Sequence, residues 1–413
     1  MPSSLWLFVW ALAAGLAQAA SIAAPWDGQP VWWLQLSSLA ILAATVQRAA
    51  SWKLAALLGW TFATAWLCGT FWWLFISMHV YGGLASPLAA LAVLGLAAFL
   101  ASYYAGACGV YRALDGSHPV LRAFVFAGAW TFAELARTVW FTGFPWGAGG
   151  YAHVDGPLAA LAPFVGVHGI GFAAALLAYA LSLMPRPGVL RSWRYWLAVG
   201  AAAGLLAACN MASLPRDAVA GAQPKLSVAL LQGNIPQDEK FEAGSGIAMA
   251  LDWYGRHLNA TTASLVVTPE TAIPMLPSQL PAGYYDAMRE RFASRAQAAL
   301  IGIPLGGYQE GYSNSVIGLA PGAPPYRFDK HHLVPFGEFT PALFKWFTRM
   351  MNIPLGDFDR GPLGQSAFEW QGQRLAPNIC YEDLFGEELA IQFADEAKAP
   401  TILPTSISGR NNS

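Results

Sequence analysis

The first half of the chain is dominated by long hydrophobic runs, whereas charged residues gather after Arg216. A helix that crosses a bilayer needs about 20 predominantly apolar residues. Seven runs roughly meet this requirement, at residues 5–24, 31–46, 54–78, 84–107, 120–141, 157–184 and 196–214. The pattern therefore predicts a polytopic α-helical membrane domain over residues 1–214, with about seven helices.

The first hydrophobic run has two interpretations. Ala17-Gln18-Ala19 resembles the cleavage site of a secretory signal peptide. However, no basic residue precedes the apolar core of this run, and six further runs follow it. We therefore interpret residues 5–24 as a retained membrane helix.

Basic residues between the runs predict the orientation of the chain, because cytoplasmic loops of membrane proteins are enriched in Lys and Arg. On or beside one set of loops lie Arg48, Lys53, Arg112, Arg122, Arg186, Arg191 and Arg194. The opposite loops carry little beyond Asp27, His79, His153 and Asp155. We expect a bacterial inner-membrane protein with a cytoplasmic N-terminus. An odd number of spans then delivers the second half of the chain to the periplasm.

The second half has the pattern of a layered α/β domain over residues 226–413, after a polar linker over residues 215–225. Short β-rich runs predict strands, and apolar positions at helical spacing predict helices between them. The predicted strands are 226–231, 265–268, 300–303 and 314–319, and the predicted helices are 247–257 and 284–299. Such alternation is typical of a sheet covered by helices.

Three ionisable residues of this domain stand at strand ends or in loops with apolar surroundings. Glu270 directly follows the run 265–269, and Lys330 and Glu338 lie among aromatic and aliphatic residues of the segment 327–341. Charged groups in apolar surroundings need partners. We therefore expect these three side chains to interact.

Cys380 ends an apolar run and precedes the acidic segment Tyr381-Glu382-Asp383. This predicts a thiol at a strand-to-helix turn, where backbone N–H groups favour a thiolate and the oxyanion that forms when it attacks a carbonyl. The alternative is an inert buried cysteine. With Glu270 as proton acceptor and Lys330 as cation, however, the set has the parts needed for covalent acyl transfer.

The composition excludes several classes of protein. The chain is 55% hydrophobic and 11% charged, which is too apolar for an ordinary soluble protein. Its 23 basic and 24 acidic residues, without basic runs, give no reason to expect nucleic acid. Three of the four cysteines lie in apolar runs, so no disulfide framework is indicated. No metal-ligand spacing or phosphate-binding glycine loop occurs, so we expect no metal and no cofactor.

Three segments resemble the nitrilase (carbon–nitrogen hydrolase) superfamily, whose triad is Glu, Lys and Cys in that order. The segments are PETAIP at 269–274, KHHLVPFGEFTP at 330–341 and NICYEDLF at 378–385. Within the superfamily they look most like the apolipoprotein N-acyltransferases of bacterial membranes. The resemblance implies an α-β-β-α sandwich and a catalytic triad of Glu270, Lys330 and Cys380.

The resemblance also implies the substrates. The acyl donor would be a membrane phospholipid, through the sn-1 ester of phosphatidylethanolamine, and the acyl group would pass through a thioester on Cys380. The acceptor would be the α-amine of the diacylglyceryl-cysteine of an apolipoprotein, in the last step of lipoprotein maturation. We expect the protein to act as a monomer.

Supporting roles are expected for four further residues. Glu338 would orient Lys330 and keep it charged, or would simply close its loop. Tyr381 and Glu382 match the family and would shape the pocket, although Glu382 could instead cap the following helix. Phe241 stands where the family commonly has tryptophan, so its role at the acyl chain is an open expectation.

Glu134 and Arg137 lie inside the fifth hydrophobic run. Ionisable residues within a membrane span are costly and often functional. At positions i and i+3 of a helix, the two could instead neutralise each other. The sequence leaves both interpretations open.

The resemblance stops at Leu403, after which the family continues through further strands and an eighth membrane helix. We therefore expect a truncated chain with a C-terminally incomplete sandwich, and an inactive product is one alternative. A second alternative is a membrane-tethered amidase or nitrilase that uses water. A third is a transporter or scaffold whose soluble domain only binds.

Overall fold

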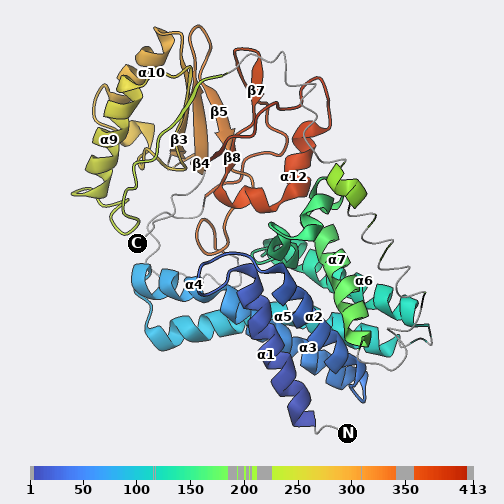
Figure 1. Ribbon diagram of the computed structural model, residues 1–413. Helices are drawn as coiled ribbons and strands as arrows, with labels where there is room; N and C mark the ends of the chain where they lie inside the picture. The colour runs from blue at the N-terminus through green and yellow to red at the C-terminus, as the bar shows by residue number, and fades with distance from the viewer. Residues whose placement is uncertain are drawn as a thin grey trace. The chain divides into compact units, whose positions relative to one another are not determined.

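The computed structural model divides the chain into two compact units, Met1–Asp217 and Ala218–Ser413 (Figure 1). The residues described are 4–114, 116, 118–184, 193, 200, 204, 207–211, 226–307, 309–340 and 358–406. The predicted linker 215–225 and most of the predicted span 196–214 lie outside these residues. We call the two parts the helical unit and the sheet unit and describe each by itself.

The helical unit is built from long apolar helices. They are α1 (Ser4–Ile22), α2 (Trp32–Gln47), α3 (Trp52–Thr70), α4 (Trp72–Ile76), α5 (Ser86–Ala113), α6 (Pro119–Val139) and α7 (Ala162–Leu183). Within the described ranges, four helices are long and apolar enough to cross a membrane. A fifth span is obtained if α3 and the segment Trp72–Tyr81, which are bent by 55° from each other, are counted together. The presence of about seven membrane spans stays a prediction.

Small residues allow these helices to approach closely. A Cβ atom on Gly59 of α3 would lie 2.6 Å from the sulfur of Cys108 on α5. Aromatic rings fill the wider spaces, and Trp66 stacks on Trp130 with ring centroids 5.8 Å apart. Close backbone approach at small residues is typical of helices that associate within a bilayer.

Glu134 and Arg137 on α6 are fully buried, but no ion pair joins them in the described part of the chain. The two side chains therefore make no direct ion pair. Arg137 donates hydrogen bonds to the carbonyl oxygens of Phe144 and Trp146, at 2.9 and 2.7 Å. Glu134 accepts one from the backbone N–H of Gly149 at 2.9 Å. Both charges thus hold the loop that follows α6.

The sheet unit contains a five-stranded sheet in the order β1-β2-β3-β4-β5. Its strands are β1 (Val228–Leu230), β2 (Leu265–Val267), β3 (Ala298–Gly307), β4 (Gly311–Leu319) and β5 (Tyr326–Asp329). The first three strands are parallel, and β3, β4 and β5 are antiparallel. Two shorter pairs follow, formed by β6 (Phe368–Trp370) with β7 (Gln373–Leu375) and by β8 (Asn378–Ile379) with β9 (Thr405–Ser406).

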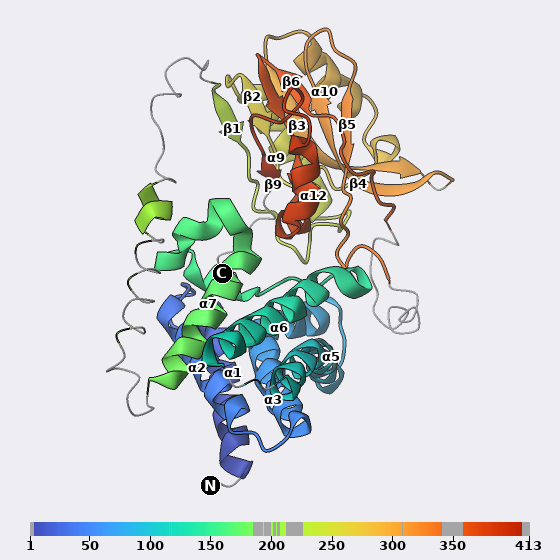
Figure 2. The same ribbon diagram turned by 90° about the vertical axis from the view of Figure 1, so that its right-hand side faces the viewer.

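Both faces of the five-stranded sheet are covered. Successive side chains of a strand point to opposite faces. In β3, Ile301 and Ile303 therefore pack in one core with α9 (Gly246–Ala260) and α10 (Tyr284–Ala293), whereas Leu300 packs in the other core with residues of β6, β7 and β8. Figures 1 and 2 show α9 and α10 on one side of the sheet and β6 to β8, with α12 (Gly386–Ala390), on the other.

These layers confirm the predicted order of the fold, a unit of long apolar helices followed by a layered α/β unit. One boundary was predicted incorrectly, because the helix expected over residues 284–299 ends at Ala293. Residue 298 already pairs with Leu265 of β2, so β3 begins earlier than the expected 300–303 and continues to Gly307. The demands of the sheet override the helical pattern at this junction.

Candidate active site

Glu270 lies in the turn that follows β2, and this turn is pressed against β3. The backbone N–H of Ile273 donates to the carbonyl oxygen of Gly302 at 3.1 Å. A Cβ atom on Gly302 would collide with the carbonyl oxygen of Pro269. Glycine at this place in β3 therefore allows the close approach that positions Glu270.

Lys330 directly follows β5, and its side chain is only 1% exposed. Its ammonium nitrogen lies 3.1 Å from Glu270 Oε1 and 2.8 Å from Glu338 Oε2. The structure therefore brings together Glu270 from the turn after β2 with Lys330 and Glu338 from the segment 327–341, as the sequence predicted for charges in apolar surroundings. A buried cation between two carboxylates satisfies the requirement that buried charges be paired.

Asn314 on β4 joins the same cluster and was not identified from the sequence. Its amide nitrogen donates to Glu270 Oε1 and to Glu338 Oε1, both at 2.6 Å. Because its side chain is 3% exposed, this amide is a fixed bridge between the two carboxylates. The sequence signal was a group of polar residues at the start of a strand, Ser313-Asn314-Ser315, in a segment that resembles the family. Such a buried polar group is more often purely structural.

Glu338 makes contacts that fit both of its expected roles. Besides pairing with Lys330, its Oε2 accepts a hydrogen bond from the backbone N–H of Val334 at 2.8 Å. Its own backbone N–H donates to the carbonyl oxygen of Val334 at 2.9 Å. Glu338 thus closes the loop after Lys330 and holds its ammonium at the same time.

Cys380 begins the 3-10 helix η8 (Cys380–Leu384) immediately after β8. Its φ angle is +52°, which is unusual for a residue other than glycine. Backbone strain of this kind often occurs where a reactive side chain must be presented at a sharp turn. The predicted strand-to-helix turn is therefore present, although the first turn after it is a 3-10 helix.

The thiol of Cys380 lies within electrostatic range of two lysines. Burial lowers the pKa of both Lys330 and Lys240, and a negative charge on Cys380 acts in the opposite direction on each. The pKa of Lys240 stays below its ordinary value. Lys240 was not identified from the sequence. Its ammonium donates to the carbonyl oxygen of Glu270 at 3.2 Å and lies 5.7 Å from the ring centroid of Phe241. The contact of Phe241 is thus with Lys240, its neighbour in the chain.

Glu382 connects the turn at Cys380 to the loop of Lys330. Its carboxylate accepts hydrogen bonds from the backbone N–H groups of Ile379 and His331, at 2.8 and 2.7 Å. Burial raises the pKa of Glu382 to about 7, although these hydrogen bonds and the charge of Lys330 act in the opposite direction. The carboxylate of Glu382 thus connects the strand end before Cys380 with the loop after Lys330. Its contacts therefore go beyond the helix cap considered from the sequence.

Tyr381 is 2% exposed and packs in a small aromatic cluster. Its ring contacts those of His332 and Phe385 edge-on, with centroids 5.5 and 5.1 Å apart. His332 in turn accepts or donates a hydrogen bond with Glu388 at 2.9 Å. This cluster packs η8 against the loop that carries Lys330.

The charges of the cluster favour a reactive arrangement. For Glu270, burial would raise the pKa, but the charge of Lys330 and hydrogen bonds from Lys330 and Asn314 lower it overall. For Lys330, burial would lower the pKa, but the charges of Glu270 and Glu338 raise it well above its usual range. At neutral pH the site therefore holds a carboxylate that can accept a proton and a permanent cation beside it.

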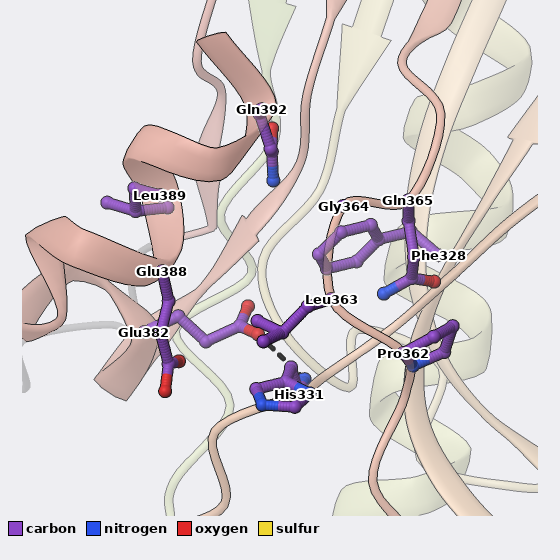
Figure 3. Close-up of a pocket in the computed structure, with 10 residues that line it drawn as sticks. All are labelled: Phe328, His331, Pro362, Leu363, Gly364, Gln365, Glu382, Glu388, Leu389 and Gln392. Atoms are coloured by element: carbon purple, nitrogen blue, oxygen red, sulfur yellow. Dashed lines mark hydrogen bonds between the residues drawn. The ribbon is translucent and has the colours of Figure 1, made fainter. Parts of the chain in front are cut away.

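A small cavity is lined by Glu382 and by residues of the loops around His331 and Pro362. Figure 3 shows Glu382 pointing toward His331, between α12 with Glu388 and the loop of Pro362 and Leu363. The space open to a water molecule is about 20 Å³, and a single water needs about 10–15 Å³. The enclosed space therefore has room for a water molecule. Among the described residues, no group of three or more His, Cys, Asp or Glu side chains is arranged to hold a metal ion.

Comparison with known proteins identifies the family. Residues 14–180 match the family described as "Apolipoprotein N-acyltransferase N-terminal domain". The chain is 58% identical to the apolipoprotein N-acyltransferase of Verminephrobacter eiseniae, over 97% of this chain and 77% of that protein. It is 43% identical to that of Ralstonia nicotianae, over 90% of this chain and 71% of that protein.

Two solved structures show weaker similarity. One is a CN-hydrolase superfamily protein from Xanthomonas campestris, with 23% identity and a TM-score of 0.29 over 40% of this chain and 56% of that one. The other is a glutamine-dependent NAD+ synthetase from Acinetobacter baumannii, with 16% identity and a TM-score of 0.28 over 40% of this chain and 30% of that one. From the match in its helical unit and the identity that extends through its sheet unit, the chain belongs to the apolipoprotein N-acyltransferase family.

Proposed function

We propose that the protein transfers an acyl chain from a membrane phospholipid to the N-terminal α-amine of a diacylglyceryl-modified apolipoprotein. The observation that carries the proposal is the buried cluster of Glu270, Lys330 and Glu338, with the charge of Cys380 acting on Lys330. It supplies a base, a fixed cation and a nucleophile in one place. Membership of the family supports this assignment of chemistry.

The first half of the reaction would acylate Cys380. Glu270 accepts the thiol proton, and the sulfur attacks the carbonyl carbon of the sn-1 ester, for which phosphatidylethanolamine is the expected donor. Lys330 and the backbone N–H of Tyr381 stabilise the oxyanion. The carbon–oxygen bond of the ester then breaks, and the departing lysophospholipid oxygen takes the proton from Glu270.

The second half would transfer the acyl group to the apolipoprotein. The neutral α-amine attacks the thioester carbon, and Glu270 removes a proton from the attacking nitrogen. The carbon–sulfur bond breaks, the acyl group remains on nitrogen as an amide, and the sulfur recovers its proton from Glu270. The same carboxylate thus serves both half-reactions in a ping-pong cycle.

The two oxygens of Glu270 have different surroundings, which suits this role. Oε1 accepts hydrogen bonds from Lys330 at 3.1 Å and from Asn314 at 2.6 Å. Within the part of the chain that the structure describes, Oε2 has no hydrogen-bond partner. Oε1 therefore anchors the carboxylate, and Oε2 is the oxygen that would exchange protons with the thiol and the amine.

The helical unit fits substrates that are both held in a membrane. Burial of long acyl chains in lipid makes their passage through water unfavourable. We propose that the helical unit lies in the bacterial inner membrane with its N-terminus in the cytoplasm, and that the sheet unit faces the periplasm. We further propose that one copy of the chain is sufficient for activity.

The test is an acyl-transfer assay with the purified chain, phospholipid labelled at the sn-1 acyl group and a synthetic diacylglyceryl-cysteinyl peptide. The proposal predicts labelled triacylated peptide, and none with Cys380→Ala or Glu270→Gln. Labelled free fatty acid without labelled peptide would instead identify a hydrolase. Peptide acylation by Cys380→Ala at the wild-type rate would rule out the proposed chemistry.

A further inference from the structure

Lys240 is a second lysine at the cluster, and nothing in the proposed reaction uses it. It lies in the segment between β1 and α9, far in sequence from Lys330. Its ammonium donates to the carbonyl oxygen of Glu270 at 3.2 Å. Lys330 therefore contacts the carboxylate of Glu270, and Lys240 contacts the backbone carbonyl of the same residue.

The positive charge of Lys240 has no carboxylate partner within 4 Å among the described residues. Lys240 is partly buried, and a cation removed from water without such a partner is unfavourable unless other negative charge lies nearby. Burial lowers the pKa of Lys240, whereas the charges of Glu270 and Cys380 raise it in part. The negative groups that Lys240 faces are thus the proposed base and the proposed nucleophile.

The charge of Lys240 changes the net charge of the cluster. Lys240 and Lys330 carry two positive charges, and Glu270 and Glu338 carry two negative charges, so the resting cluster is neutral. When the thiol proton moves to Glu270, the thiolate replaces the carboxylate and the cluster stays neutral. Without Lys240, both states carry one negative charge, and in a site of low dielectric constant an unbalanced charge disfavours a new anion.

We propose that Lys240 is a positioning residue that holds the backbone of Glu270 and supplies a second positive charge favouring the ionised form of Cys380. This inference rests on the proposed role of Cys380 as the nucleophile. The other charged groups of the cluster are Glu270, Lys330 and Glu338, from the segments after β2 and β5. Glu382 lies on η8 with Cys380. Each of these groups stays unchanged in variants of Lys240.

The experiment measures the ionisation of Cys380 directly. Full-length protein in detergent is treated with iodoacetamide between pH 5 and 10, and the alkylation rate of the peptide containing Cys380 is read by mass spectrometry. Lys240→Met removes the charge and the donor, Lys240→Gln keeps a hydrogen-bond donor without the charge, and Lys240→Arg keeps both. Lys398→Met is the matched control, because Lys398 is 84% exposed and lies in another part of the unit.

The expected result is a thiol pKa about one unit higher in Lys240→Met and Lys240→Gln. At a pH below the wild-type value, this corresponds to alkylation about tenfold slower. Lys240→Arg and Lys398→Met should retain the wild-type thiol pKa. An unchanged thiol pKa in Lys240→Gln would overturn the role of the charge, even if Lys240→Met failed to fold.

Failure of this inference can be told apart from failure of the proposed function. Alkylation needs no substrate, so the thiol pKa can be measured even if the protein transfers no acyl group. A shifted thiol pKa without acyl transfer would uphold the electrostatic role and remove the proposed reaction. Acyl transfer through Cys380, together with an unshifted thiol pKa in the Lys240 variants, would uphold the proposed reaction and remove the electrostatic role of Lys240.

Discussion

At the scale of single residues, the site depends on hydrogen bonds that fix two carboxylates around one ammonium. Asn314 is the neutral member of this group, and it donates to Glu270 and Glu338 at 2.6 Å. Hydrogen bonds to charged groups contribute about 1.5–3 kcal/mol each. Loss of this amide should therefore loosen the position of the base Glu270 and also destabilise the sheet unit.

We predict that Asn314→Ala lowers kcat about 10- to 100-fold, because one or two charged hydrogen bonds are lost. Asn314→Asp should be worse, since a third carboxylate would face Glu270 and Glu338. Acyl-transfer kinetics provide the measurement, with Asn259→Ala on the exposed end of α9 as the control. Wild-type kcat in Asn314→Ala would show that the bridge has no role in catalysis.

The residues missed from the sequence share a physical cause. Glu270, Lys330 and Cys380 could be proposed because each stands in a segment with a distinctive pattern. Asn314 and Lys240 look like an ordinary polar strand residue and an ordinary loop lysine until folding places them beside Glu270. Their significance depends on contacts between distant segments, which no local pattern records.

At the scale of elements, the turn after β2 and the strand β3 must lie unusually close together. Gly302 makes this possible because any Cβ atom there would meet the carbonyl oxygen of Pro269. Gly307, at the end of the same strand, has open space where its Cβ would be. The two glycines therefore allow a matched comparison.

We predict that Gly302→Ala displaces the turn that carries Glu270 and destabilises the sheet unit by about 1–3 kcal/mol. Activity should fall by at least tenfold, because the base moves away from Lys330 and Cys380. Gly307→Ala should leave both properties near wild type. Thermal unfolding and transfer assays on both variants give the comparison, and equal behaviour of the two would refute the importance of close packing here.

The connection made by Glu382 between η8 and the Lys330 loop should depend on pH. Its pKa in the folded protein is about 7, against an ordinary value of 4.5, with burial as the main cause. The folded state therefore binds more protons than the unfolded state between these values. The contribution of Glu382 to stability is fully present below pH 4.5, declines as the pH rises to about 7, and is constant above it.

We predict that Glu382→Gln removes this decline between pH 4.5 and 7. The difference in unfolding temperature between wild type and variant, measured across that range, isolates the contribution of one carboxyl group. A parallel series with Glu369→Gln on β6 controls for a general effect of removing acid. A difference that does not vary with pH would contradict the raised pKa of Glu382.

The elements themselves were largely predictable, but their ends were not. The continuous buried run in β3 and the long apolar runs in α1, α5, α6 and α7 match the patterns from which these elements were expected. The helix expected over residues 284–299 was too long, since pairing with β2 begins at Ala298. The direct pairing considered for Glu134 and Arg137 is absent, and each side chain instead makes a hydrogen bond with backbone groups of the following loop.

At the scale of the whole molecule, the protein combines a multi-pass helical unit with a sheet unit whose buried cluster suits covalent acyl transfer. Both units belong to the apolipoprotein N-acyltransferase family by sequence. The account predicts that the sheet unit lies outside the cytoplasm. An impermeant maleimide added to intact spheroplasts should therefore block Cys380 in a variant that lacks the other three cysteines, and protection until lysis would contradict the orientation.

The central claim is that sulfur carries the acyl chain. The most direct measurement is the intact mass of the peptide containing Cys380 after the protein is incubated with phospholipid and without acceptor. The account predicts an added acyl group that neutral hydroxylamine removes, and that disappears when a diacylglyceryl-cysteinyl peptide is added. Triacylated peptide formed by a protein whose Cys380 never gains mass, under conditions that trap thioesters, would contradict it.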